Sequence, residues 1–241
     1  MKFIAHRGES IDAPENTMSA FRLAWKRGAV GIEGDFYKLT DGRIACMHDP
    51  NAKRTTGVDV DICTIDYDRL STFDAGSWKG AEWRGETVPL LDDIFKELPA
   101  SCLIYAEVKD DSDGIIEAIR DVAEKYNIKS EQLVIISFSE AAIIRSSEVI
   151  PDSKRYLLTR FEYSADELIE KLKQTYADGV DCDCRFDNEL DREYVSKVKS
   201  AGFEFHVWTV NDIETAQRMI DAGVDSITSD CASELRSLAC V

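Results

Sequence analysis

The chain has 241 residues, 44% of them hydrophobic and 31% charged, which is typical of a globular protein and argues against a membrane-spanning or disordered one. Its 46 acidic and 29 basic residues give a formal net charge of −17, so nucleic acid and anionic membrane surfaces are poor general partners. A small anionic substrate is still compatible with this charge if a cation or an arginine reverses the local field.

The amino-terminal residues predict a strand and no leader. Lys2–Ala5 is followed at once by His6, with no apolar segment and no small-residue cleavage site, so we expect a cytoplasmic protein without a secretory signal. The seven cysteines are an odd number and most lie in apolar segments, which indicates reduced thiols. Cys182 and Cys184 are too closely spaced for a zinc knuckle, and we interpret them as strand residues.

The first third of the chain then predicts a helix and two strands joined by a turn. Asn16 or Thr17 can cap the helix, and a turn-forming Asp-Gly pair separates the strands. In chain order we expect a helix from Glu15–Thr17 to about Arg27, a strand at Ala29–Tyr37, a turn at Thr40–Gly42 and a returning strand at Arg43–Met47.

Residues 51–90 interrupt this alternation. Aspartates alternate there with single apolar residues, and three glycines break any longer periodicity. The segment is too short and too poor in apolar residues for an independent core, so we interpret it as an insertion in a single domain that spans residues 1–241.

From about residue 102 onward, strands and helices alternate regularly. Strands are predicted at Cys102–Val108, Leu133–Ser137, Arg155–Leu158, Gly179–Cys184, Glu204–Thr209 and Asp225–Thr228. Helices are predicted at Asp113–Tyr126, Glu140–Val149, Ala165–Tyr176, Asp191–Ala201, Asn211–Ala222 and Ala232–Leu238. The pattern predicts an α/β fold, a TIM (β/α)8 barrel with a small insertion after the second strand unit.

Acidic residues lie at the ends of two predicted strands. Glu33 and Asp35 are two residues apart and point to one face of their strand, and Glu107 ends the next parallel strand. Active sites of this fold lie at the carboxyl ends of the strands, where the three carboxylates would meet. A set of oxygen ligands favours Mg²⁺ or Ca²⁺ over zinc or copper, so we predict a divalent metal site.

Other polar residues at the same strand ends suit phosphate chemistry. His6 and His48 would flank the metal, and a histidine pKa near working pH suits general acid and base catalysis. Arg7 and Lys109 would bind a phosphate and stabilise charge developing on it. The residues themselves therefore predict metal-assisted cleavage of a phosphate ester.

A series of motifs in this order resembles the glycerophosphodiester phosphodiesterase family. The resemblance extends over nearly the whole chain and is more specific than any one motif. The matching segments include Ala5-His6-Arg7-Gly8, Ala13-Pro14-Glu15-Asn16-Thr17, Ile32-Glu33-x-Asp35, His48-Asp49, Arg54-Thr55-Thr56-Gly57, Glu107-Val108-Lys109, Val207-Trp208-Thr209-Val210-Asn211 and Gly223-Val224-Asp225-Ser226-Ile227.

The resemblance implies hydrolysis of glycerophosphodiesters to glycerol 3-phosphate and an alcohol, in lipid and glycerol metabolism. It implies that His6 and His48 are the acid/base pair. By the same resemblance, the metal ligands are Glu33, Asp35 and Glu107, and the substrate contacts are Arg7, Lys109 and Trp208. In the family's usual mechanism the glycerol 2-hydroxyl attacks phosphorus and water opens the resulting cyclic phosphate. We assign His48 as the base and His6 as the acid.

Three positions depart from the family's pattern: Gly34, Lys38 and the closing turn Thr228-Ser229-Asp230, which no proline follows. We expect none of them to touch a proposed catalytic group. Trp78 and Trp83 are expected to pack the insertion.

Two further polar residues lie on predicted strands. His206 shares its strand face with Trp208 and is expected to be a core histidine with a hydrogen-bond partner. Ser137 is equally consistent with a substrate contact and with a cap on the following helix.

Two other functions remain alternatives. One is a phospholipase D-like lyase on the same barrel that releases a cyclic phosphate, but we expect no stable membrane association, and the chain shows no exposed apolar segment for one. The other is a non-catalytic barrel. The chain retains both histidines and all three acids, which argues against this alternative. The sequence leaves open the alcohol group, the choice between Mg²⁺ and Ca²⁺, and the oligomeric state.

Overall fold

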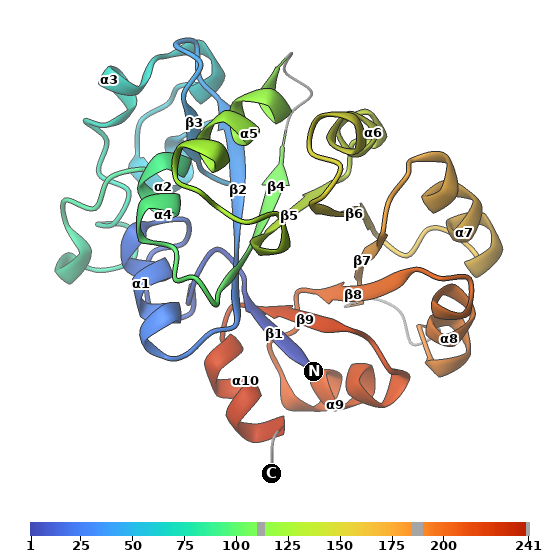
Figure 1. The fold of residues 1–241 in the computed structure, drawn as a ribbon. Coiled ribbons are helices and arrows are strands. Elements are labelled where there is room, and N and C mark those ends of the chain that lie inside the picture. The colour runs from blue at the N-terminus through green and yellow to red at the C-terminus, as the bar shows by residue number, and fades with distance from the viewer. Residues whose placement is uncertain (110–113, 185–189, 240–241) are drawn as a thin grey trace.

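A closed ring of parallel strands forms the centre of the computed structural model, which describes residues 1–109, 114–184 and 190–239 (Figure 1). Strand β1 pairs with both β2 and β9, so eight parallel strands in the described residues close into a barrel. They are β1 (Lys2–Ala5), β2 (Gly31–Lys38), β4 (Leu103–Val108), β5 (Leu133–Ser137), β6 (Lys154–Thr159), β7 (Gly179–Asp183), β8 (Glu204–Trp208) and β9 (Ser226–Ser229).

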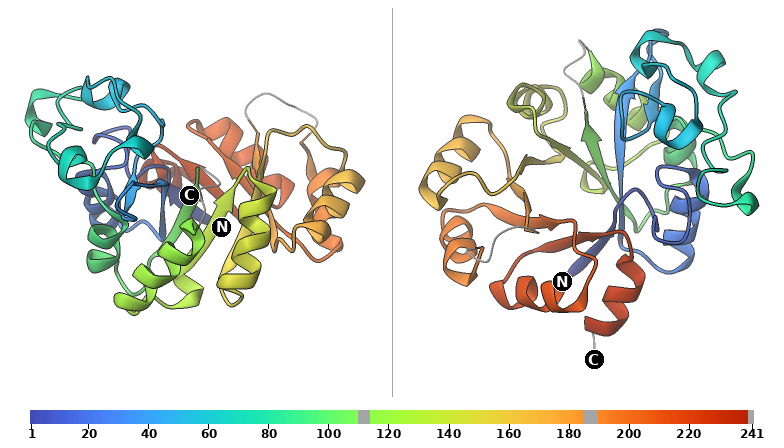
Figure 2. Two further views of the ribbon diagram at one scale, coloured as in Figure 1. Left: turned by 90° about the horizontal axis from the view of Figure 1, so that it is seen from above. Right: turned by 180° about the vertical axis from the view of Figure 1, so that it is seen from behind.

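Helices cover the outside of this ring, as both views in Figure 2 show. They are α1 (Met18–Lys26), α4 (Leu91–Glu97), α5 (Ile115–Lys125), α6 (Glu140–Val149), α7 (Ala165–Gln174), α8 (Arg192–Ser200), α9 (Ile213–Ala222) and α10 (Ala232–Ala239). Polar caps start several of them: Thr17 accepts a hydrogen bond from the Ala20 amide, and Ser164 forms a capping box with Glu167.

The predicted TIM barrel is confirmed, and the helices differ from the prediction in some bounds and in the presence of short ones. Helix α4 was not predicted, because its seven residues are too few to show a helical period in the sequence. The helix expected to start at Asp113 begins at Ile115, and Asp113 itself lies outside the described residues. The predicted strand ends differ from the observed ones by a residue or two, because pairing with neighbouring strands decides where a strand ends.

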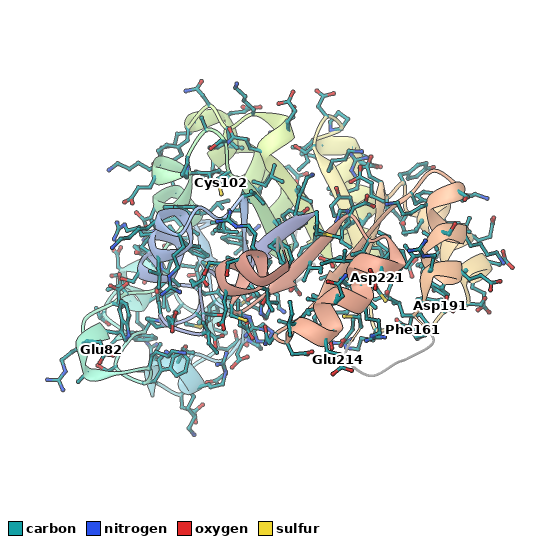
Figure 3. The ribbon with its side chains drawn as sticks, turned by 90° about the horizontal axis from the view of Figure 1, so that it is seen from below. Glu82, Cys102, Phe161, Asp191, Glu214 and Asp221 are labelled. Atoms are coloured by element: carbon teal, nitrogen blue, oxygen red, sulfur yellow. The ribbon has the colours of Figure 1, made fainter. Side chains whose placement is uncertain are left out.

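The returning strand and the insertion form a lobe beside the carboxyl end of the barrel. Strand β3 (Ile44–Cys46) runs antiparallel to β2, with Phe36 opposite Cys46. The insertion contains the short helices α2 (Lys53–Thr56) and α3 (Tyr67–Leu70) and the 3₁₀ turns Ile62–Thr64 and Ala81–Trp83. Figure 3 shows Glu82 at the outer edge of this lobe.

The insertion has more buried apolar residues than the sequence suggested. Ile62, Leu70 and Phe73 belong to a small core, to which residues outside the insertion also contribute. Tyr37 from β2 and Ala45 from β3 complete the core and so attach the lobe to the barrel.

Large side chains fill the barrel interior toward its amino-terminal end. Ile4, Tyr105, Val134 and Tyr156 are all at most 4% exposed and pack against one another. The space left inside the barrel therefore opens at the carboxyl ends of the strands. Among the described residues, none of the helices is both long and apolar enough to cross a lipid bilayer.

Candidate active site

A cavity of about 1010 Å³ opens at the carboxyl ends of the barrel strands. Seven of the eight residues predicted for the site line it, namely His6, Arg7, Glu33, His48, Glu107, Lys109 and Trp208. The eighth, Asp35, lies fully buried within ion-pair distance of Arg7 and Lys109. The structure thus brings the predicted residues together around one cavity.

The turn after β1 directs the backbone of Arg7 toward an acidic side chain. Arg7 has a positive φ of 56°, and its amide donates a hydrogen bond to Glu33 Oε2 at 2.8 Å. Gly8 follows with φ 84°, and a Cβ there would lie 2.6 Å from Ala20 backbone and side-chain atoms. Only glycine fits this position, so the His-Arg-Gly sequence fixes the direction of the turn.

The three carboxylates of Glu33, Asp35 and Glu107 form a compact cluster. One oxygen from each lies within 4.8 Å of the other two. Strands β2 and β4 hold them in place, with Asp35 in register with Glu107, and Asn16 donates to Asp35 Oδ2 at 2.7 Å. Glu33 Oε1 and Asp35 Oδ1 are buried and find no hydrogen-bond partner in the part of the chain described. This all-oxygen donor set fits a hard divalent cation.

Two cations offset part of this negative charge. Lys109 Nζ lies 2.8 Å from Glu107 Oε1 and 3.3 Å from Asp35 Oδ1, and Arg7 Nε lies 3.3 Å from Asp35 Oδ2. With all groups ionised, three carboxylates and two cations leave one negative charge. A divalent ion and a phosphodiester with one negative charge would together neutralise it.

The carboxyl groups titrate differently because their surroundings differ. Burial raises the pKa of Glu33 well above its ordinary value, and the charges of Asp35 and Glu107 raise it further. Burial and Asp35 also raise the pKa of Glu107, to about 7. Burial opposes ionisation of Asp35 too, but Arg7 and Lys109 outweigh it and hold its pKa below the usual range.

His6 is bound through one ring nitrogen to a carboxylate that the sequence analysis missed. Its Nδ1 donates to Asp230 Oδ1 at 2.6 Å, and its Nε2 lies 4.0 Å from Glu33 Oε2. Ser10 and Asn211 also donate to Asp230 and hold it in place. The expectation that the closing turn touches no proposed catalytic group was therefore wrong, because barrel closure places β9 beside β1.

His48 is held by a chain of charged groups. Its Nδ1 donates to Asp49 Oδ1 at 2.7 Å, and Arg54 Nε donates to Asp49 Oδ2 at 2.6 Å. Arg54 also donates to Glu15, which accepts from Arg7. Burial lowers the pKa of His48, and Arg7 and Lys109 lower it further against the attraction of Asp35. These interactions favour the neutral imidazole, the form that can accept a proton.

Aromatic side chains from the barrel and from the insertion line the cavity. Trp208 donates from Nε1 to the Asp181 carbonyl at 3.1 Å and packs edge to face on Phe138, with ring centroids 5.8 Å apart. Trp78 was expected to pack within the insertion, yet it is 42% exposed and lines the cavity. The contact of Lys79 Nζ with the Ser10 carbonyl at 2.8 Å ties this part of the insertion to the barrel.

Two other residues from the sequence analysis have structural contacts. His206 is fully buried, and its Nδ1 lies 2.7 Å from Ser226 Oγ, as expected for a core histidine. Ser137 lines the cavity, donates to the Val108 carbonyl at 2.7 Å and accepts from the Ser139 amide. The cap of helix α6 is Ser139, not Ser137.

Sequence reasoning missed the residues that orient the two histidines and one carboxylate of the cluster. These residues lie in or next to motifs, but nothing in their spacing indicated which side chains they contact. They are Asp230, Asp49, Arg54 and Asn16. A signal did exist for three of them: Asn16 lies at a predicted helix start, and Asp49 and Asp230 lie two residues after predicted strands.

The model of the glycerophosphoryl diester phosphodiesterase family matches residues 6–233. The chain belongs to this family. It is accordingly a glycerophosphodiester phosphodiesterase, an enzyme that hydrolyses phosphodiesters of glycerol.

Several similar proteins match this chain over nearly their whole length. The glycerophosphodiester phosphodiesterase of Caldanaerobacter subterraneus is 31% identical over 98% of this chain and 96% of its own. That of Bacillus altitudinis is 29% identical over 95% of this chain and 94% of its own. A solved phosphodiesterase of Oleispira antarctica, in complex with the product sn-glycerol-3-phosphate, is 28% identical, with a TM-score of 0.92 over 100% of this chain and 97% of its own.

Proposed function

We propose that this enzyme hydrolyses glycerophosphodiesters to glycerol 3-phosphate and an alcohol with a divalent ion, Mg²⁺ or Ca²⁺, held by Glu33, Asp35 and Glu107. The observation that carries the proposal is the carboxylate cluster, in which one oxygen from each residue lies within 4.8 Å of the other two. Glu33 Oε1 and Asp35 Oδ1 are buried and accept no hydrogen bond from a described residue, although Lys109 Nζ lies 3.3 Å from Asp35 Oδ1. When bound, such an ion supplies positive charge opposite the oxygens of the phosphate. The product complex of the Oleispira antarctica relative supports the choice of product.

Arg7 and Lys109 are proposed to bind the phosphate. Both line the cavity, and both are already held beside the cluster by Asp35. Contacts with the carboxylates keep the two cations in place, so little side-chain freedom is lost when the phosphate binds. Trp208 is proposed to pack against the carbon atoms of the substrate, beside Phe138, which contacts it edge to face and also lines the cavity.

His48 and His6 are proposed to move the protons. Each Nδ1 is bonded to a carboxylate, which leaves Nε2 as the nitrogen for proton transfer. Neutral His48 takes the proton of the glycerol 2-hydroxyl as its oxygen bonds to phosphorus. Protonated His6 gives a proton to the alcohol oxygen as its bond to phosphorus breaks.

The second step reverses these roles. His6, now neutral, takes a proton from water as the water oxygen bonds to phosphorus. His48 returns its proton to the glycerol 2-oxygen as the cyclic phosphate opens. Both histidines end the cycle in their starting states.

The test is release of glycerol 3-phosphate from glycerophosphocholine and glycerophosphoethanolamine, with and without EDTA. We expect turnover that EDTA abolishes and added Mg²⁺ or Ca²⁺ restores. His48→Ala should lower kcat by about 10²- to 10⁴-fold, because the proton acceptor is lost. EDTA-insensitive turnover would contradict the metal, and a protein that binds metal but cleaves neither substrate would contradict the proposed reaction.

A further inference from the structure

Two polar side chains on the floor of the cavity have no part in the chemistry above. Asp181 on β7 and Thr228 on β9 both line the cavity, on either side of the strand that carries Trp208. They are 1% and 2% exposed, so both belong to the barrel interior. The same floor contains the apolar side chains of Ile136 and Leu158.

Both polar side chains lack the partners that buried groups normally have. Asp181 Oδ1 and Thr228 Oγ1 are buried, and no described residue forms a hydrogen bond with either. Removing a polar atom from water without giving it a hydrogen-bond partner costs free energy. Two such atoms in a cavity wall therefore indicate a ligand that forms the missing hydrogen bonds. The ligand must reach both atoms from the cavity side.

The position of Asp181 separates it from the phosphate end of the site. Around the ring, β7 lies four strands from β2 in either direction, so Asp181 is across the barrel from Glu33 and Asp35. A carboxyl oxygen accepts a hydrogen bond from a hydroxyl, and a threonine hydroxyl can donate or accept. The floor therefore suits an alcohol group.

A neutral group also fits better there than the ammonium of a headgroup. Burial raises the pKa of Asp181 to about 8, and the charge of Glu107 adds to the effect. A quaternary ammonium such as that of choline has no hydrogen to donate and would leave both atoms unpaired. A primary ammonium such as that of ethanolamine could donate, but it would bring a charge into a buried site whose carboxyl group is largely uncharged near pH 7. A hydroxyl satisfies both.

The two ends of the site differ in the space that they offer a substrate. Beneath the floor, Ile4, Tyr105 and Tyr156 pack the barrel closely, so a long chain has no space below it. At the mouth, Ile11 and Trp78 are 52% and 42% exposed and line the cavity where it meets solvent. The small glycerol unit thus fits the floor, and the variable alcohol fits the mouth.

We propose that Asp181 and Thr228 form a subsite for the terminal hydroxyl of the substrate's glycerol, so the enzyme acts on glycerophosphodiesters in which that hydroxyl is free and rejects those in which it bears a fatty acyl chain. The inference rests on the proposed function, because the 2-hydroxyl is engaged at phosphorus and only the terminal hydroxyl is left. Asp181 and Thr228 are specificity residues and take no part in proton transfer.

The test compares glycerophosphocholine with its analogue built on propane-1,2-diol, which keeps the 2-hydroxyl and lacks the terminal one. We expect kcat/KM of the wild type to be roughly tenfold or more higher for glycerophosphocholine, because the analogue leaves buried polar groups unpaired. Thr228→Val should bring the ratio toward one, and Thr228→Ser should restore it. Valine matches the shape of threonine and removes the unpaired hydroxyl, so this variant is expected to fold.

The role of Asp181 is tested by measuring the same ratio of kcat/KM values in Asp181→Leu and Asp181→Asn. Only the asparagine variant keeps a hydrogen-bonding group. Lysophosphatidylcholine with an acyl chain on the terminal oxygen should be a poor substrate of the wild type. Equal kcat/KM for the two phosphocholine substrates, or a ratio that neither Thr228→Val nor Asp181→Leu changes, would overturn the subsite. The subsite would also be overturned if the variants changed only the preference among headgroups and left the preference for the terminal hydroxyl unchanged.

A binding experiment separates the failure of this subsite from failure of the proposed function. Calorimetry of the metal-loaded protein compares sn-glycerol 3-phosphate with propane-1,2-diol phosphate and needs no turnover. Tighter binding of the first, lost in Thr228→Val, supports the subsite even if neither diester is cleaved. Equal binding of the two overturns it even if glycerophosphocholine is hydrolysed as proposed.

Discussion

At the amino-terminal end of the barrel, His206 is enclosed on all sides, whereas His6 and His48 at the carboxyl end stand at the edge of a cavity. The ring of His206 lies on that of Tyr156, with centroids 4.0 Å apart, and its Nδ1 meets Ser226. The side chains of His6 and His48 are 14% and 33% exposed, and each is bonded to a carboxylate.

Residue type and strand face do not separate these histidines. His206 points into the barrel just as Trp208 does two residues later, yet only the second reaches the cavity. The difference lies in depth, because packed side chains fill one end of the barrel and a ligand can enter only the other. Substitutions at the carboxyl end should therefore change activity, and substitutions at the amino-terminal end should change stability.

The largest effect is expected from Glu107→Gln, which removes one carboxylate of the cluster. Divalent metal affinity should fall by more than the roughly 100-fold that loss of an outer partner costs, and activity should fall with it. Calorimetric titration with Mg²⁺ and Ca²⁺ measures the affinity. Glu82→Gln removes the same charge at the outer edge of the insertion (Figure 3) and should leave both unchanged.

A metal affinity that Glu107→Gln leaves intact would remove this residue from the ligand set. A loss of equal size in Glu82→Gln would show that overall charge, and not the cluster, determines binding.

A smaller effect is expected from Asp230→Asn, which keeps a hydrogen-bonding group beside His6 but removes the negative charge. The His6 ring would lose the carboxylate that holds its orientation, so kcat should fall roughly 10- to 100-fold. Steady-state kinetics on glycerophosphocholine measure this, with Asp221→Asn on helix α9 as the control (Figure 3). An unchanged kcat would mean that Asp230 only supports the local fold.

The smallest effect on activity, near none, is expected from His206→Gln, which tests the other end of the barrel. Loss of the contact with Ser226 and of ring packing on Tyr156 should lower the free energy of unfolding by about 1–3 kcal/mol at pH 7.5. Urea denaturation measures the stability, and kcat on glycerophosphocholine should stay at the wild-type value. A large loss of kcat in a folded variant would break the comparison between the two ends.

The same variant has a defined pH dependence. Burial lowers the pKa of His206 in the folded state, against the attraction of Glu204. The unfolded chain takes up a proton near the ordinary histidine pKa of about 6.5, so this contribution to wild-type stability is present above that pH and is lost as pH falls toward the folded pKa. The stability difference between wild type and His206→Gln should therefore be smaller at pH 5.5 than at pH 7.5. A difference that grows on acidification would show a charged His206 bound to Glu204.

Much of the fold and half of the site could be predicted because their signals are local. Alternation along a strand places Glu33 and Asp35 on one face, and the helical periods between strands indicate a parallel barrel. The family's motifs then connected His6, His48 and Glu107 with one chemistry. Each period and each motif is recognised from residues near one another in the sequence.

What only the tertiary structure decided involves pairs far apart in the chain. Asp230 meets His6 across 224 residues, and Arg54 meets Glu15 across 39. Trp78 reaches the cavity because the insertion folds onto β2 and β3 and over the barrel mouth.

The floor formed by Asp181 and Thr228 was equally hidden, since an inward strand residue can be either packed or open to a cavity. Sequence spacing sets the direction of a side chain, because the backbone period is fixed. Its neighbours, and the space left beside it, are set by the closure of the barrel between β1 and β9 and by the packing of the layers within it.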